Sequence, residues 1–555
     1  MKSDVGGRRP EVTRREILAA FLGLPAAMAG CSSGTPSSLP SGEIVGASEG
    51  IGHRIRDGIR LWSANDRSEK FGVVIVGGGI AGLAAAWRLV KAGYRDFSLL
   101  ELEKVPGGTS RSGTSQVISY PWGAHYVPAP MADNRLFITL LGEMGILEGN
   151  DSEGKPIVAE QYLCRDPQER IFYKGRWYEG LYLHAGESPE DQVEFQAFHA
   201  EIDRWAAWRD GQGRRAFAIP MATGSDDAEV TALDKISMED WLDRHGWQSS
   251  RLRWLVNYAC RDDYGTILEE TSAWAGLFYF VSRLRKPGAE PQPFITFPEG
   301  NGRMVAHLHS RVEPRVRLGW AAAAIIPTDP AGRKGVDVVA VDHAGETIRG
   351  LHADQVIFAA PHFLAPYIIR PYRENLPRHV RAFEYAVWMV ANLTLNDRPR
   401  VSGFPLAWDN VIYESPSLGY VVATHQKGLE RGPTVFTYYY PLCCESPAAA
   451  RRKLLGLDWQ SCADIVLTDL TRPHPEIRTL VERLDVMRWG HAMIRPRPGF
   501  VWGGARTAAA RPYRGIYFGN SDLSGVGLFE EALYHGVRAA EEVLAVRGIP
   551  FTSLL

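Results

Sequence analysis

A run of β-branched residues followed at once by closely spaced glycines is the feature that most constrains this sequence. Residues 73–76 read Val-Val-Ile-Val, and residues 83–92 after the glycines have an apolar face typical of a helix. The run suits a strand that is buried on both faces. Gly77 permits a tight turn, Gly79 lets the backbone approach a pyrophosphate, and Gly82 lets the helix pack closely on the strand. The pattern predicts a dinucleotide site.

The surrounding residues support that prediction. Ile80 and Ala81 open the expected helix, whose N-terminus offers unpaired N–H groups and partial positive charge to phosphates. A second expected strand, residues 97–100, ends at Glu101. A carboxylate at that distance can accept hydrogen bonds from ribose hydroxyls. The pattern at residues 77–82 and Glu101 is compatible with either FAD or NAD as the dinucleotide.

The segments that follow resemble the flavin-containing amine oxidoreductase family, which includes monoamine and polyamine oxidases, carotenoid-type desaturases and protoporphyrinogen oxidases. Residues 104–111 read Lys-Val-Pro-Gly-Gly-Thr-Ser-Arg, and residues 120–125 read Tyr-Pro-Trp-Gly-Ala-His. The resemblance implies that Gly108 lies along the pyrophosphate of FAD. It also implies that the Gly-Ala-His element, Gly123 to His125 with Ala124 between them, lies beside the isoalloxazine. The segment after the glycine pair contains Thr109 and Arg111. The family usually has Arg at position 109, so the phosphate-neutralising role is expected to pass to Arg111.

The resemblance recurs later in the chain, at residues 298–304, 318–325, 356–361 and 516–540. Within 318–325 it implies that the backbone of Ala322 or Ala323 contacts adenine. Within 516–540 it implies a last strand and helix of the FAD-binding part. The acidic residue expected near the end of that strand is assigned to Asp522, although an ungapped alignment would select Ser521.

The expected fold class is α/β: a Rossmann-like FAD-binding domain of the glutathione-reductase-like, amine oxidase type, with an inserted α+β substrate-binding domain. The three parts of the FAD-binding domain are expected at residues 71–130, 298–365 and 485–555. The substrate-binding domain is expected at residues 131–297 and 366–484. Since a second glycine motif with strand and helix around it is missing from the sequence, a nicotinamide site is not expected.

The first part of the chain resembles an export signal. Arg14-Arg15 precedes an apolar run at residues 19–29 that is too short for a permanent membrane span. The arginine pair resembles the twin-arginine signal, and residues 28–31, Met-Ala-Gly-Cys, resemble a lipoprotein cleavage box. Residues 1–30 are therefore expected to be removed, with Cys31 lipidated and the protein exported to the periplasm or cell envelope. The alternative is cleavage by ordinary signal peptidase, with Cys31 incidental. Residues 31–70 are expected to be a flexible tether.

Three residues are candidates for catalysis. His125 belongs to the element expected at the flavin ring, while Trp489 and His491 lie in a segment that resembles the Trp-containing element of the family. Trp489 suits an aromatic cage for a cation or a planar substrate, and a His can move a proton near neutral pH. The alternatives are a core tryptophan and structural histidines. The lysine that amine oxidases of the family commonly place near flavin N5 has no counterpart near residues 388–389.

Composition limits the remaining choices. Lys+Arg 62 against Asp+Glu 64 gives a formal charge of -2, which argues against a nucleic-acid partner. The cysteines lack metal-ligand spacing, so no metal is expected, and residues 488–504 contain no Cys that could hold a flavin covalently.

We expect noncovalent FAD, a small-molecule substrate oxidised at a C–N or C–C bond by hydride transfer to flavin N5, and oxygen or another electron acceptor. Desaturation or isomerisation of an apolar substrate and a non-catalytic FAD-binding lipoprotein are the alternatives. Oligomeric state does not follow from the sequence.

Overall fold

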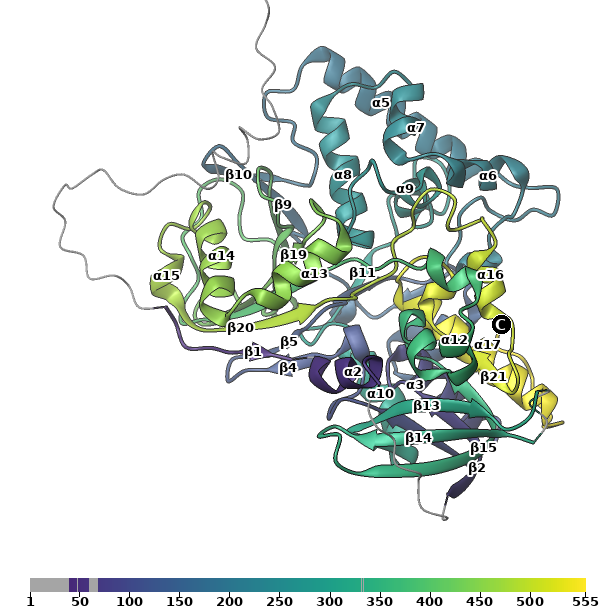
Figure 1. Cartoon of the computed structure of the whole chain (residues 1–555). Coiled ribbons are helices and arrows are strands. Elements are labelled where there is room, and N and C mark those ends of the chain that lie inside the picture. Colours follow the sequence, from purple (N-terminus) through teal and green to yellow (C-terminus); the bar gives the residue numbers. More distant parts are fainter. Residues whose placement is uncertain (1–38, 47, 59–67, 331, 333) are drawn as a thin grey trace, which may run out of the picture. The chain divides into compact units, whose positions relative to one another are not determined.

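The computed structural model describes residues 39–46, 48–58, 68–330, 332 and 334–555, and it has a mixed α/β fold built on two large sheets (Figure 1). The first sheet has seven strands. Along the sheet they are β12 (Val316–Leu318), β3 (Phe97–Glu101), β2 (Glu69–Val76), β15 (Ile348–Phe358), β14 (Val336–Asp342) and β13 (Trp320–Pro327), and β21 (Ile516–Phe518) also pairs with β15.

The strands around β2 are parallel, as the β-branched run predicts. Val73 pairs with Phe97 of β3 and with Gln355 of β15, and residues 73–76 are buried. β21 joins β15 in parallel, whereas β13 and β14 are antiparallel. The carboxyl ends of β2, β3, β15 and β21 therefore meet at one edge, which is where parallel sheets bind ligands.

Three helices from distant parts of the sequence cover one face of this sheet: α3 (Ile80–Lys91), α10 (Gly302–Val312) and α17 (Phe529–Val546). α17 crosses α3 at very short distance, because a Cβ at Gly536 would collide with the carbonyl oxygen of Ala81. Their apolar faces share one core with α10. This packing holds the N-terminus of α3 beside the carboxyl edge of the sheet.

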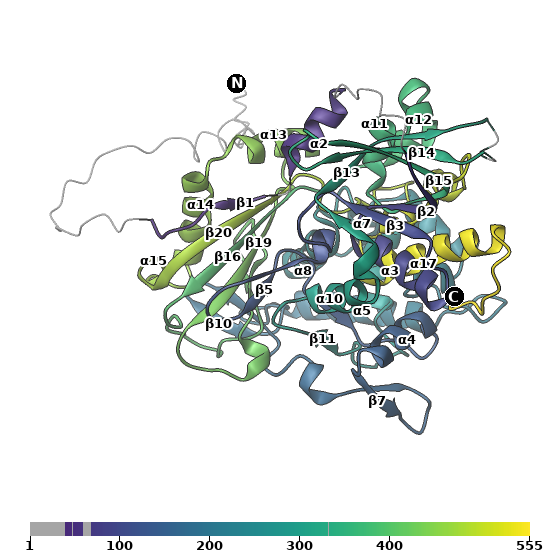
Figure 2. The same cartoon turned by 90° about the horizontal axis from the view of Figure 1, so that it is seen from below.

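The second sheet has eight strands. Along the sheet they are β1 (Ile44–Val45), β20 (Val481–Trp489), β16 (Trp388–Leu395), β19 (Thr434–Pro441), β18 (Gly419–Val422), β17 (Asp409–Ile412), β9 (Glu169–Tyr173) and β10 (Arg176–Glu179). Most neighbours are antiparallel, but β17 and β9 run in parallel and pair Asp409 with Glu169. Helices α13 (Pro447–Gly456) and α14 (Trp459–Thr471) cover this sheet, and Figures 1 and 2 both show them beside β20.

A group of helices that includes α5 (Pro189–Ala207), α7 (Met238–Arg244), α8 (Ser250–Tyr264) and α9 (Ala273–Val281) forms a third core. Ser188 and Ser237 begin α5 and α7 with reciprocal capping boxes. The aromatic residues of this region mostly pack against one another: Trp205, Trp241, Trp274 and Phe278 are buried. Their helical spacing therefore marks a core rather than a pocket wall.

The prediction of a flexible tether over residues 31–70 is wrong for the described part that precedes β2. β1 pairs in parallel with β20, and α2 (Glu49–Arg56) buries Ile51 and Ile55 against the first sheet. Glycine makes this docking possible, because a Cβ at Gly42 would collide with the carbonyl oxygen of Leu484. Ser, Gly and Pro composition was a misleading signal here, because glycine also permits close packing. The other domain boundaries stay predictions.

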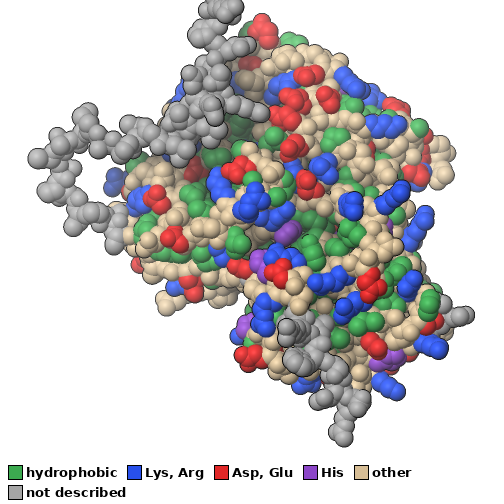
Figure 3. Space-filling view, in the orientation of Figure 1, with side chains coloured by type: hydrophobic (Ala, Val, Ile, Leu, Met, Phe, Trp, Pro, Cys, Tyr) green, Lys and Arg blue, Asp and Glu red, His purple; other side chains and the backbone are tan. Residues whose placement is uncertain are grey.

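Several predictions lie outside the described residues or concern the surface. The expected signal at residues 1–30 and Cys31 are not among the described residues. Within the described part of the chain, no helix combines the length and the apolar character of a membrane span. Figure 3 shows basic and acidic side chains interspersed over one face, in keeping with the net charge of -2.

Candidate functional site

The glycine turn lies between β2 and α3 with the geometry that an anion site needs. Gly77 has φ +105°, and a Cβ there would lie 3.0 Å from the backbone nitrogen of Ala360. A Cβ at Gly82 would collide with the carbonyl oxygen of Gly77, whereas the space around Gly79 is open. Gly79 begins α3 without a side-chain cap, and the first turn carries no acidic residue. The N–H groups at Ile80 and after it thus face an open cradle with positive potential.

Glu101 is fixed beside this turn at the end of β3. Its Oε2 accepts a hydrogen bond of 2.6 Å from the N–H of Gly78, and its Oε1 accepts one of 2.8 Å from the N–H of Glu103. Burial raises the pKa of Glu101. Gly78, which the sequence analysis gave no role, is also required, because a Cβ there would lie 2.8 Å from the Glu101 side chain.

The two segments of the family resemblance lie next to the glycine turn. Gly107 donates its N–H to the Gly78 oxygen over 2.8 Å. A Cβ at Gly108 would lie 3.5 Å from Cα of Gly79. Ala124 donates to the oxygen of Thr109 over 2.9 Å, and a Cβ at Gly123 would collide with that same oxygen. The fold therefore brings these segments together, as the resemblance implies.

Arg111 is buried and already has protein partners. Its Nη2 lies 3.2 Å from the oxygen of Gly46 and 3.0 Å from Sδ of Met487, and its Nη1 lies 3.7 Å from Oε2 of Glu103. The guanidinium lies 5.1 Å from the ring centre of Trp489. Burial lowers the pKa of Arg111. The predicted contact between Arg111 and a phosphate stays a prediction.

The expected adenine strand begins beside Glu101. Gly319, which separates β12 from β13, has φ +75° and donates its N–H to the oxygen of Glu103 over 2.9 Å. Ala322 and Ala323 in β13 are buried, and the register with β14 is irregular between residues 322 and 324. Both alanines therefore belong to the same sheet as the glycine turn.

Asp522 lies in the short helix η9 (Ser521–Leu523) directly after β21. Its Oδ2 accepts hydrogen bonds from the N–H of His362 over 2.8 Å and from the O–H of Tyr385 over 2.5 Å. Burial raises the pKa of Asp522. Asn520 donates to the oxygen of Ala360 over 3.0 Å, which ties this segment to the residue beside Gly77.

The first turn of α17 contains two buried carboxyl groups, those of Glu530 and Glu531. Glu531 accepts a hydrogen bond of 2.6 Å from the N–H of Met221 and another from the hydroxyl of Ser524. Burial raises the pKa of Glu531 to about 7. Ser524 also lies 2.8 Å from Nε2 of His535. These partners satisfy Glu531 and His535, so both fit within the tight packing of α17.

A group of carboxyl side chains that the sequence analysis missed lies between the second sheet and α8. Asp409 and Glu169 begin the neighbouring strands β17 and β9 and pair in register. Tyr258 donates its hydroxyl to Oδ2 of Asp409 over 3.2 Å, and Asp262 lies on the same helix as Tyr258. Arg283 pairs with Asp263 at 3.1 Å. We call Glu169, Asp262 and Asp409 the carboxyl cluster.

Burial controls the protonation of this cluster. It raises the pKa of Glu169 and of Asp262 to about 7, with repulsion from Asp263 as a second cause at Asp262. Burial, and then the charges of Glu169 and Asp262, raise the pKa of Asp409 well above its usual value. A bound cation stabilises the ionised form of desolvated, mutually repelling carboxyl groups, since a positive charge offsets both the desolvation and the repulsion.

Aromatic rings form the neighbouring wall. His125 stacks on Tyr439 at 4.8 Å between ring centres and lies 5.4 Å from Trp408. Tyr126 contacts Phe294 at 4.6 Å and Trp408 at 5.8 Å. Burial lowers the pKa of His125 to about 4, and its Nδ1 lies 3.3 Å from the oxygen of Gly123. A neutral His125 at pH 7 suits the lining of a cavity better than the donation of a proton.

The other two catalytic candidates lie at separate positions. Trp489 donates Nε1–H to the oxygen of Trp122 over 2.7 Å, and one of its faces is covered by Arg111. His491 stacks on Phe363 at 4.0 Å, and burial lowers the pKa of His491 to about 4. Trp489 thus borders the segment that holds Gly123, whereas His491 packs as a neutral ring. Their catalytic roles stay predictions.

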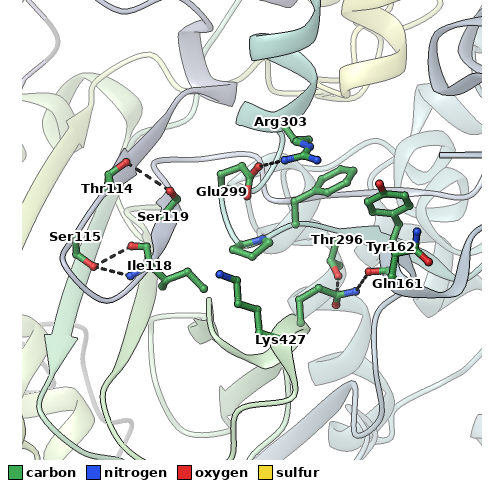
Figure 4. Close-up of a pocket in the computed structure, with 13 residues that line it drawn as sticks. Thr114, Ser115, Ile118, Ser119, Gln161, Tyr162, Thr296, Glu299, Arg303 and Lys427 are labelled. Carbon is green, nitrogen blue, oxygen red and sulfur yellow. Dashed lines mark hydrogen bonds and ion pairs between the residues drawn. The ribbon is translucent and has the colours of Figure 1, made fainter. Parts of the chain in front are cut away.

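An outer cavity of about 470 Å³ is lined by Tyr162, Thr296 and Lys427 among others (Figure 4). A smaller inner space, lined by His125 and Trp408 among others, shares Thr296, Phe297, Pro298 and Gln426 with it. Gln426 accepts from Oγ1–H of Thr296 over 2.6 Å and donates to the oxygen of Leu163 over 2.7 Å, and these bonds fix its side chain in the wall that the two spaces share. The side chain of Lys427 points into the outer cavity (Figure 4).

The carboxyl cluster lies close to the wall that the two spaces share. The charges of Glu169 and Asp409 both raise the pKa of the Cys164 thiol, which burial raises most, and Cys164 also interacts with Thr296. Among the described residues, no group of three or more His, Cys, Asp or Glu side chains could hold a metal ion.

Comparisons with known proteins agree with this arrangement. Residues 80–544 match the family described as flavin containing amine oxidoreductase. A search of curated proteins gave no match.

Among solved structures, the chain is similar to a double mutant of putrescine oxidase, with 17% identity and a TM-score of 0.63 over 86% of this chain and 100% of that chain. It is also similar to cyclohexylamine oxidase from Brevibacterium oxydans IH-35A, with 15% identity and a TM-score of 0.59 over 86% and 99% of the two chains. A fatty acid isomerase from P. acnes, described as producing CLA, has 15% identity and a TM-score of 0.58 over 86% and 98%. At these identities the likeness concerns the fold alone.

Proposed function

The chain belongs to the flavin-containing amine oxidoreductase family, and on that premise we propose that it binds FAD noncovalently and oxidises the C–N bond of a small cationic amine. The family implies a flavin cofactor. The observation that carries the choice of substrate is the carboxyl cluster, with aromatic rings beside it and a raised pKa at each of its three members.

The residues around the glycine turn fit a dinucleotide. The N-terminus of α3 is uncapped, and a cradle stays open because Gly79 lacks a side chain. Glu101 would bind the ribose hydroxyls, and the backbone at Ala322 or Ala323 would contact adenine. We infer that the first sheet with α3, α10 and α17 is a Rossmann-like FAD-binding domain, and that the second sheet and the helices around α8 form the substrate-binding domain.

The flavin would lie with its ring near Gly123, Ala124 and His125. When bound, it supplies an acceptor for the hydride that leaves the carbon next to the substrate nitrogen. Residues 488–504 contain no cysteine for a thioether, which supports noncovalent binding. The acceptor that reoxidises the flavin is oxygen or another small molecule.

The side chains of the carboxyl cluster and of the aromatic rings beside it have separate tasks in this proposal. Glu169 and Asp262 attract the ammonium group, and the rings of Trp408 and Tyr439 exclude water and favour a cation through their faces. An ammonium must lose a proton before its neighbouring C–H bond can be oxidised. Asp409, whose pKa is well above the usual value, is able to hold that proton on its carboxylate.

Oxidation of an amine is favoured over desaturation or isomerisation of an apolar substrate for the same reason. Desolvated carboxyl groups are costly to ionise, and an apolar chain would add nothing to the attraction that Arg283 exerts on Glu169 and Asp262. A non-catalytic FAD-binding lipoprotein would not need a cluster whose ionisation depends on a bound cation.

Export and lipid anchoring at Cys31 are part of the proposal, on the sequence of residues 1–31 alone. The test is cell fractionation of the full chain. The protein should be found in the cell-envelope membrane fraction, a Cys31→Ser variant should be released in soluble exported form, and an Arg14→Lys, Arg15→Lys double variant should stay in the cytoplasm. A wild-type protein that stays in the cytoplasm would contradict the proposal.

The enzymatic proposal is tested with purified protein in two steps. Denaturation and precipitation should release FAD into the supernatant, whereas flavin that stays with the precipitate would contradict noncovalent binding. Oxygen consumption and aldehyde formation should then follow addition of diamines or monoamines, but not of an unsaturated fatty acid. Conversion of the fatty acid without any amine oxidation would select the isomerase alternative.

A further inference from the structure

Residues 39–46 and 48–49, which we call the N-terminal strap, are joined to the second sheet by specific contacts. β1 pairs with β20 in the register Ile44 to Val486. The N–H of Glu43 donates to Oδ1 of Asp485 over 3.1 Å, and Glu49 forms an ion pair with Arg488 at 2.8 Å. The strap thus follows β20 toward its end at Trp489.

One end of the strap is linked to the glycine turn. Ser48 donates its N–H to Oε1 of Glu103 over 2.7 Å and its hydroxyl to Oε2 over 3.1 Å. Glu103 in turn donates its N–H to Oε1 of Glu101, whose Oε2 accepts from Gly78. Ser48 begins α2 but gives its hydroxyl to Glu103 rather than to the helix. Hydrogen bonds to the side chain of Glu103 and from its backbone therefore link the strap to the dinucleotide cradle.

The strap also reaches the other side of the site through Arg111. The oxygen of Gly46 accepts from Nη2 of Arg111 over 3.2 Å, and the guanidinium lies over the ring of Trp489. Trp489 donates to the oxygen of Trp122, which directly precedes Gly123. The strap, Arg111 and Trp489 thus form one packed unit beside the segment proposed to border the flavin ring.

We propose that the N-terminal strap is a positioning element of the flavin site, with Ser48 orienting Glu103 and Gly46 orienting Arg111; this rests on the proposed FAD binding. Glu103 and Arg111 lie 3.7 Å apart and carry opposite charges. Without the strap, Arg111 would turn toward Glu103 or solvent. Glu101, Arg111 and Trp489 would then have to be ordered when FAD binds, which lowers affinity.

The test measures FAD affinity of the flavin-free full chain by quenching of flavin fluorescence. Ser48→Ala should raise the Kd for FAD about tenfold, since it removes one hydrogen bond to a charged group. Gly42→Val should raise the Kd further, because its side chain would collide with Leu484 and lift the strap from β20. Gly50→Val is the matched control within the strap's neighbouring helix, since a Cβ at Gly50 meets nothing within 4 Å.

Two further readouts separate positioning from general stability. Ser48→Thr keeps the hydroxyl and should restore the wild-type Kd and the visible circular dichroism of bound flavin, both of which Ser48→Ala changes. The melting temperature of the flavin-free protein should stay near wild type in Ser48→Ala. If the wild type, Ser48→Ala and Gly42→Val all bind FAD with the same Kd, the strap's role is overturned but the proposed FAD binding is not. A wild type that takes up no FAD would overturn the proposed function together with it.

Discussion

The two sides of the site are built in different ways. The dinucleotide side is formed by Gly77, Gly79 and Gly82 with Glu101, all within one strand–helix–strand unit. The proposed substrate side consists of Glu169, Asp262 and Asp409, which come from two strands and a helix that are distant in the sequence. The dinucleotide side depends on backbone geometry, and the proposed substrate side depends on half-buried carboxyl groups.

This difference predicts different sensitivities. Changes at the glycine turn should abolish cofactor binding and reduce stability together, since the same close contacts serve both. Changes in the carboxyl cluster should reduce turnover and leave FAD bound, because the cluster contacts other segments. Mutations on each side can therefore test whether cofactor binding and turnover depend on separate parts of the protein.

The largest effect is expected for Gly82→Val. The added side chain would collide with the carbonyl oxygen of Gly77 and force α3 away from β2. We expect loss of FAD and a decrease of about 3 kcal/mol in the free energy of unfolding, measured by urea denaturation. Gly142→Val is the control, because a Cβ at helical Gly142 meets nothing within 4 Å. Normal FAD content in Gly82→Val would show that the turn is not the cradle.

The next effect is expected for Asp409→Asn. Loss of the Asp409 carboxyl group, the proposed proton acceptor, should reduce kcat/KM for a diamine about 100-fold, while the Kd for FAD stays unchanged. Asp464→Asn, an exposed residue of α14, should have little effect. A parallel loss of FAD in Asp409→Asn would mean that the two sides of the site are not separate.

A pH profile tests the charge of the cluster. Burial raises the pKa of Glu169 and Asp262 to about 7, so both are neutral below that pH and ionised above it. Since ionised carboxylates attract the cation, kcat/KM should rise about tenfold as pH increases from about 6 to 8. Glu169→Gln should flatten this rise. A profile that falls with pH over that range would contradict the role of the cluster.

The smallest effect is expected at the outer cavity. Lys427 points into it, and on the proposed substrate route its positive charge would repel cations on their way to the inner space. Lys427→Glu should raise kcat/KM for a diamine about threefold at low salt, and high salt should remove the gain. Lys235→Glu, at an exposed position in η4 (Leu233–Lys235), is the control. An equal gain from both variants would exclude this route for the substrate.

The dinucleotide side was predictable from the sequence, whereas the proposed substrate side was not. The cradle was predictable because strand, turn and helix are contiguous, and glycine at each position has a local steric reason. The positions of Gly108, Thr109, Gly123 and Ala124 followed from the family resemblance, and the structure brings them to the turn.

The carboxyl cluster was not predictable from the residues around each acid. Glu169 and Asp409 are neighbours only because β9 and β17 pair in parallel, and neither strand carries a local motif. Tyr385 and His362, which bond to Asp522, were missed for the same reason. The N-terminal strap was misassigned because glycine at position 42 permits close docking as well as flexibility.

The most direct test of the central claim is anaerobic reduction of the FAD-loaded protein by a diamine, followed through the visible absorbance of the flavin. The wild type should bleach on addition of the amine, and Asp409→Asn with the same FAD content should bleach about 100-fold more slowly. Dithionite should reduce both. A wild-type flavin that dithionite reduces but that no amine bleaches would contradict the assignment of the carboxyl cluster as an amine site.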